Sequence, residues 1–166
     1  GSVDIELVGD YYLSEDPEFQ FYCPENANWI SFGWIGGLMN TFPMLALNDR
    51  IHFERVAKTF DFALPRAQGE AGYFYGALNY DGIPFGREGY NEFPEIVLTR
   101  KNADVLFWMI KQFKLLKVQG KEESIKPEWE ENIQDLADAF VSTWKIYGQW
   151  GRMLNSKVQK HFSPGK

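Results

Sequence analysis

Apolar side chains recur at three- and four-residue steps in four stretches of the chain, which is the spacing of one face of an α-helix. The most regular stretch runs from residue 98 to residue 118, with Thr99 as a candidate N-cap and Gln119-Gly120 as a stop signal. On this helix Arg100 and Asp104 are four residues apart and are expected to form a structural ion pair. The apolar face is expected to comprise Ala103, Leu106, Phe107, Ile110, Phe113 and Leu116 or Lys117.

A further helix is expected to open at Pro127, because proline fits the first turn of a helix and acidic residues favour its positive end. It should end near Gly148 or Gly151, and residues 151–166 are expected to form a loose, polar tail. Its apolar face is Ile133, Leu136, Ala137, Phe140, Val141, Trp144 and Tyr147. Residues 98–150 therefore form one predicted helix pair.

Residues 29–64 form the other predicted helix pair. The first helix is expected to start after Asn28 as its N-cap, with Pro43 kinking or breaking it. A short turn at Asn48-Asp49 leads to a second helix from about residue 50 to residue 64, which Pro65 stops. The apolar positions of the pair are Trp29, Ile30, Trp34, Ile35, Leu38, Phe42, Leu45 and Ala46, then Ile51, Val56, Phe60 and Leu64.

Residues 65–97 separate the two pairs and lack a helical pattern. Residues 73–78 alternate as a short strand or hairpin would, and Asp81-Gly82 is a turn dipeptide. A connection of this length is uncommon in a compact domain and is usually functional when it is ordered. Before the first pair, residues 3–28 mix apolar and acidic positions and are expected to form an irregular or weakly extended N-terminal arm.

Length and charge narrow the range of partners. A chain of 166 residues is the size of one domain, and its net charge of −6 without a basic, aromatic patch disfavours nucleic acid. No apolar run is long enough to span a bilayer. Cys23 is the only cysteine, so no disulfide can form within the chain. Gly1-Ser2 is typical of an expression scar, and we expect a periplasmic or secreted protein whose leader is not present here.

Two helix pairs joined by a long aromatic loop define an all-α fold. Residues 32–49 (FGWIGGLMNTFPMLALND), 72–76 (GYFYG) and 98–116 (LTRKNADVLFWMIKQFKLL) resemble segments of large, mostly bacterial, glycosidase-like proteins. The resemblance implies antiparallel hairpins of the (α/α) toroid, or six-hairpin glycosidase, type. A complete toroid needs far more chain than this, so we expect either a fragment or a smaller helical domain. A fragment would expose apolar faces, which favours a homo-oligomer or association with missing parts of the parent chain.

Glycoside hydrolysis usually needs two carboxyl groups facing each other across a sugar. The long loop carries Glu70, Asp81, Glu88, Glu92 and Glu95. Among these, Asp81 and Glu88 are the candidate catalytic residues, since each lies between glycines and aromatic residues. The alternative is that both are solvated loop or turn residues. The toroid families place their catalytic acids at other positions, so the resemblance carries over no catalytic residue.

Saccharide binding is the broader hypothesis, since aromatic rings stack on pyranose rings and polar side chains bind hydroxyl groups. Aromatic residues make up 17% of the chain, more than a small helical core needs. The candidate binding residues are Trp34, Tyr73, Tyr75, Asn79, Tyr80, Arg87 and Tyr90. The alternative is a loop packed by its own side chains.

Neither a metal site nor a cofactor is expected. His52 and His161 lack a metal-binding spacing, and the segment GREGYNEF lacks the features of a phosphate-binding loop. Three functions therefore stay open: a glycoside hydrolase-like protein, a non-catalytic carbohydrate-binding module, and a helical scaffold or interaction domain.

Overall fold

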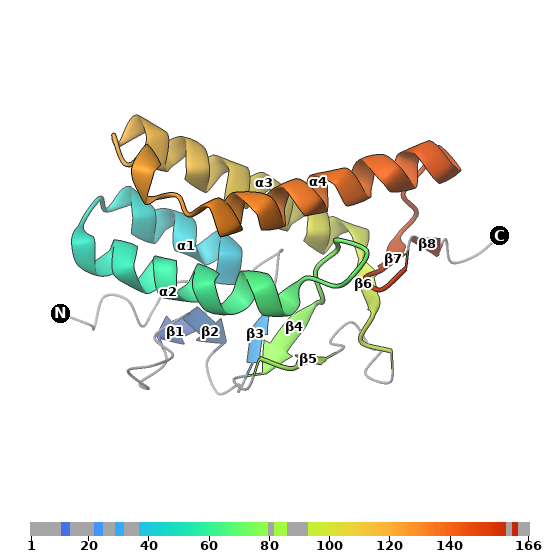
Figure 1. Cartoon of the computed structure of the whole chain (residues 1–166). Coiled ribbons are helices and arrows are strands. Elements are labelled where there is room, and N and C mark those ends of the chain that lie inside the picture. The colour runs from blue at the N-terminus through green and yellow to red at the C-terminus, as the bar shows by residue number, and fades with distance from the viewer. Residues whose placement is uncertain are drawn as a thin grey trace.

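The computed structural model describes residues 11–13, 22–24, 29–31, 37–79, 82–85, 93–158 and 161–162. In this part of the chain four α-helices form two stacked antiparallel pairs, with α3 over α1 and α4 over α2 (Figure 1). The helices are α1 (Gly37–Ala46), α2 (Arg50–Ala67), α3 (Thr99–Val118) and α4 (Pro127–Tyr147), and a 3₁₀ turn, η2 (Glu122–Ser124), lies between α3 and α4. The predicted helical character is confirmed.

Short antiparallel strands complete the described structure. Figure 1 shows the first two sheets beneath the helices and the third at their far end. The first sheet pairs β1 (Tyr11–Leu13) with β2 (Tyr22–Pro24). The second has the order β3 (Trp29–Ser31), β4 (Ala77–Asn79), β5 (Pro84–Phe85), and the third β6 (Ile96–Leu98), β7 (Met153–Asn155), β8 (His161–Phe162).

The boundaries of α3 and α4 agree with the sequence prediction. Gly120 and Gly148 have φ angles of 73° and 65°, the left-handed conformation that glycine adopts readily at the end of a helix. Pro127 is the first residue of α4, where its missing N–H breaks no helical hydrogen bond. Arg100 and Asp104 approach to 4.0 Å, as predicted.

The predicted start of the first helix is wrong. Residues 29–31 form strand β3, in which Trp29 lies opposite Asn79 on β4, and α1 begins only at Gly37. Pairing with β4 satisfies the backbone groups that a helix would have satisfied. Pro43 lies inside α1 without ending it. Pro65 lies inside α2, which continues to Ala67, because a proline in the last turn removes only one helical bond.

Of two expectations outside the helices, one is met in part and the other needs correction. The segment predicted as an irregular or weakly extended arm contains the extended, paired strands β1 and β2. The segment predicted as a loose tail begins with β7, whose Met153 and Leu154 are buried and which pairs with β6. Bonding to β6 holds the tail, since a strand in a ladder has its backbone hydrogen bonds satisfied.

The interior face of α3 is rotated from the predicted one. Phe107 and Ile110, predicted to face the core, are 55% and 44% exposed, whereas Asn102 and Gln112 are buried. Gln112 Nε2 donates to the carbonyl of Leu38 on α1 at 2.8 Å. On α2 the predicted inner residues Val56, Phe60 and Leu64 are buried, but Ile51 is 58% exposed.

Candidate functional site

Residues 68–76, which follow α2 and which we call the connection, fold back against α4. They carry Tyr73 and Phe74 of the GYFYG segment into the core. Tyr73 is fully buried, and its hydroxyl donates to the carbonyl of Ala139 at 2.9 Å. The Thr143 hydroxyl lies 2.7 Å from the same oxygen. Burial raises the pKa of Tyr73, and the hydrogen bond with Thr143 partly opposes this shift. The Tyr73 ring thus packs between helices and offers no open face to a ligand.

Asn102 fixes the next residue of the segment. Its side-chain oxygen accepts from the backbone N–H of Phe74 at 2.7 Å, and its amide nitrogen donates to the Phe74 carbonyl at 3.1 Å. These two hydrogen bonds are the ones that a neighbouring β-strand would make with Phe74, although Asn102 belongs to the first turn of α3. The connection is therefore held to α3 as well as to α4.

A pair of amides anchors the connection to α4. Gln68 Nε2 donates to the backbone carbonyls of Gly72 and Asn132, both at 2.8 Å. Asn132 Nδ2 returns a bond to Gln68 Oε1 at 2.8 Å. Gly72 has a φ of 94°, and a Cβ placed there would lie 2.7 Å from the carbonyl oxygen of Asp135. Only a glycine lets the backbone approach α4 this closely.

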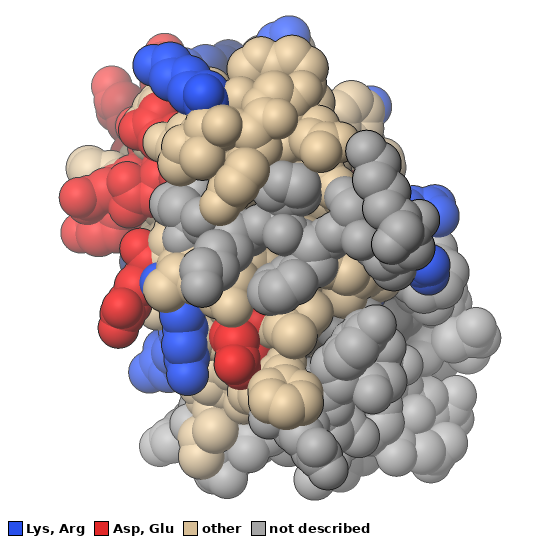
Figure 2. Space-filling view, turned by 90° about the vertical axis from the view of Figure 1, so that its right-hand side faces the viewer, with Lys and Arg blue, Asp and Glu red and all other residues tan. Residues whose placement is uncertain are grey.

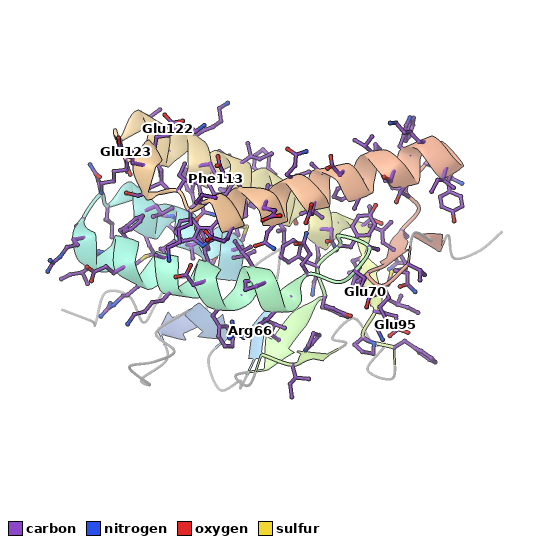
Figure 3. All side chains as sticks on the ribbon, viewed as in Figure 1. Arg66, Glu70, Glu95, Phe113, Glu122 and Glu123 are labelled. Carbon is purple, nitrogen blue, oxygen red and sulfur yellow. The ribbon has the colours of Figure 1, made fainter. Side chains whose placement is uncertain are left out.

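The backbone of residues 68–72 and α4 line an open, polar cleft of about 610 Å³. Three carboxylates line it: Glu70 from the connection, and Asp135 and Asp138 from α4. We call this space the acidic cleft, and its full lining is Pro65, Gln68, Gly69, Glu70, Ala71, Gly72, Asn132, Asp135, Asp138, Ala139 and Ser142. Figure 3 labels Glu70 at the bend of the connection, and Figure 2 shows Asp and Glu side chains gathered on one side of the molecule.

The chemistry of the acidic cleft is that of a hydrogen-bond acceptor. Ionised carboxylates accept and do not donate, so the cleft suits ligands with hydroxyl or ammonium groups. No Lys or Arg is among its described lining residues. Ser142 adds one hydroxyl, while Pro65, Ala71 and Ala139 add apolar surface.

A second cavity, of about 590 Å³, lies at the start of α3 and has the opposite charge. Arg100, Lys101 and Arg152 line it together with Leu98, Thr99 and Gly151. Thr99, the predicted N-cap, is the first residue of the helix instead, and its hydroxyl donates to the carbonyl of Gly151 at 2.9 Å. That bond ties α3 to the segment leading into β7.

The structure reaches few of the predicted site residues. Asp81, Glu88, Trp34, Tyr80, Arg87 and Tyr90 lie outside the described residues. Asn79 ends β4, and its side chain is also outside the described part. Tyr73 is core, which corrects its assignment as a binding residue, and Tyr75 is half-buried.

Sequence reasoning missed the residues that line the acidic cleft from α4. Asp135 and Asp138 are three residues apart, so one face of the helix carries both carboxylates. That spacing was visible in the sequence, but it is also the ordinary pattern of a solvated helix face. Glu70, by contrast, was among the acids noted in the loop.

Within the described residues, no group of three or more His, Cys, Asp and Glu side chains could hold a metal ion. None of the described helices is both long enough and apolar enough to cross a membrane.

Comparisons with family models, with curated proteins and with solved structures found no match to this chain. The resemblance to glycosidase-like toroids therefore stays a prediction.

Proposed function

We propose that this chain binds a saccharide in the acidic cleft. The observation that carries the proposal is the placement of carboxylates on both walls of one cavity, Glu70 on the connection and Asp135 and Asp138 on α4. A saccharide presents many hydroxyl donors, and a carboxylate is the strongest acceptor that a protein side chain offers them.

Size and rigidity support the same choice. The volume, about 610 Å³, lies within the range of roughly 300–1,000 Å³ that is usual for small-molecule sites. The wall that carries Glu70 is held by the Gln68–Asn132 amide pair and by Gly72. A wall fixed in this way loses little conformational entropy when a ligand binds.

Glycoside hydrolysis is the second candidate, and the carboxylates that two different segments contribute to one cleft favour it. A hydrolase of this kind uses one carboxyl group as an acid and another as a base or nucleophile on either side of the scissile bond. Glu70 with Asp135 or Asp138 would supply such a pair from the described residues. The predicted pair of Asp81 and Glu88 stays an alternative source.

The test titrates soluble neutral oligosaccharides into the chain and follows backbone amide resonances and the heat of binding. We expect the amides of residues 68–72 and 132–142 to shift. Glu70→Gln and Asp138→Asn should each weaken binding about tenfold, which corresponds to roughly 1.4 kcal/mol. The matched control is Glu123→Gln, an exposed acid at the opposite end of the molecule (Figure 3).

Failure to shift these amides with any oligosaccharide would overturn the proposal, as would equal losses in the control. Hydrolysis is measured separately as new reducing ends at saturating saccharide. Release of sugar that disappears in Glu70→Gln supports the hydrolase, whereas binding without release leaves a carbohydrate-binding module.

A further inference from the structure

The outer faces of α3 and α4 expose more apolar surface than a solvated helix pair needs. On α3, Phe107 and Ile110 are 55% and 44% exposed, and on α4, Val141 and Trp144 are 49% and 50% exposed. Within each helix the two residues are three apart, so they share one face. We call these four residues the apolar strip.

The apolar strip faces away from the α1–α2 layer. On α3, Gln112 bonds to α1 and Trp108 packs on Phe42 of α1, so the side carrying Ile110 is turned from that helix. On α4, Val141 and Trp144 do not line the acidic cleft, but Asp138 does and lies three residues before Val141, so the strip borders the cleft. Trp150 packs on Trp144, with ring centroids 4.7 Å apart, and the four residues of the strip are still 44–55% exposed.

Charged residues of opposite sign lie toward one end of the apolar strip. On the α3 side lie the exposed Lys111 and Lys114, and the Lys111 ammonium also lies over the rings of Phe107 and Trp108, at 5.3 and 5.1 Å, and of Phe42 on α1, at 5.3 Å. On the α4 side lie the exposed Glu130 and Glu131. α3 and α4 are antiparallel and joined by a short segment, so the end of α3 lies level with the start of α4.

This arrangement is complementary to itself. A two-fold axis parallel to the helices would lay α3 of one copy across α4 of another and keep their levels matched. Lys111 and Lys114 of each copy would then approach Glu130 and Glu131 of the other, while the apolar residues meet farther along the helices. A two-fold axis at right angles to the helices would instead stack α3 of one copy on α3 of the other. The lysines of each copy would then face a helix that carries the same positive charges.

We propose that the apolar strip is the interface of a symmetric dimer of this chain. A face of two helices about 30 Å long and 20 Å wide offers roughly 600 Å² per copy. That is somewhat below the roughly 800 Å² per partner of a standard interface, which suits a transient dimer. The two-fold arrangement is isologous, the commonest way in which soluble chains associate.

The experiment is sedimentation velocity on the full chain over a wide range of concentration. We expect the mass to rise from 19.3 kDa toward twice that value. Ile110→Glu and Val141→Glu should each hold the chain as a monomer throughout. Both side chains are about half-exposed, so neither change should unfold the domain, which circular dichroism verifies. The matched control is Ile51→Glu, since Ile51 is 58% exposed but lies on α2.

The charge pattern gives a second, sharper test. Lys114→Glu should weaken the dimer about tenfold at low salt, because like charges then face each other across the interface. Adding Glu131→Lys to the same chain should restore it, since both copies then carry the reversed pair. A chain that stays monomeric at all concentrations, or a dimer that survives Ile110→Glu and Val141→Glu, would overturn the proposal. Saccharide titration of Ile110→Glu keeps the two proposals distinguishable, because Ile110 lies on α3 and does not line the acidic cleft.

Discussion

Replacing Asn102 by alanine tests whether one side chain holds the connection between the helix pairs in place. Asn102 is 1% exposed and bonds to both backbone groups of Phe74. The alanine keeps the helix and removes both partners at once. A buried backbone group that loses its partner costs about 1–3 kcal/mol, so the free energy of unfolding should fall by about 3 kcal/mol.

That loss is large but tolerable, since a domain is usually stable by about 5–15 kcal/mol. For a chain of this size, about 3 kcal/mol corresponds to a drop of roughly 6–12 °C in the melting temperature. Urea denaturation followed by circular dichroism measures the change. We expect a lower midpoint and an unchanged slope, because the surface exposed on unfolding stays the same.

The control is Gln134→Ala. Gln134 also uses a side-chain amide, donating to Asp138 at 2.9 Å, but this pair is exposed on one helix face. Its removal should cost no more than about 0.5 kcal/mol. Hydrogen exchange adds a local measurement, since the Phe74 amide should exchange faster in Asn102→Ala. A loss below about 1 kcal/mol with the Phe74 amide still protected would refute the two hydrogen bonds to Phe74.

Three further predictions concern backbone shape and pH. Gly72→Ala should lower the free energy of unfolding by about 3 kcal/mol, because the alanine would be strained in a left-handed conformation and its Cβ would clash with α4. Gly120→Ala is the control and should cost only about 1 kcal/mol, because the space around Gly120 is open. Equal losses for the two variants in urea denaturation would contradict the close approach of Gly72 to α4. The raised pKa of Tyr73 means that the unfolded chain ionises first, so stability should fall as pH rises above about 10, and Tyr73→Phe should flatten that fall in thermal melts. Asp49 accepts hydrogen bonds from the backbone N–H and the side chain of His52, and these bonds lower the pKa of Asp49. The contribution of Asp49 to stability is therefore present above pH 3.8 and is lost below it. Asp49→Ala should have a lower melting temperature than the parent chain at neutral pH and the same melting temperature in acid.

Local signals determined which parts of the fold could be predicted. The ends of α3 and α4 follow from Gly120, Pro127 and Gly148, residues whose backbone preferences act within one turn. The pairing of residues 29–31 with residues 77–79, and of 96–98 with 153–155, could not be read from local patterns. Three-residue strands carry almost no periodicity, and their stability comes from partners far along the chain.

The acidic cleft was hidden for a related reason. It exists because Gly72 lets the connection approach α4, and because Gln68 pairs with Asn132 across 64 residues of sequence. The sequence does not indicate that Gln68 pairs with Asn132, or that Gly72 lies against α4. Asp135 and Asp138 have the spacing of any solvated helix face, so their position on a cleft wall depends on what the connection places opposite them.

The rotated face of α3 bears on the dimer itself. A periodic pattern identifies apolar residues that need cover, but it does not say whether the cover comes from the same chain. On α3 the buried polar residues answer that question, because Asn102 and Gln112 find their hydrogen-bond partners within this chain and so fix which side is interior. Phe107 and Ile110 are then left on the outside. In the dimer that we propose, a second copy of the chain would cover them.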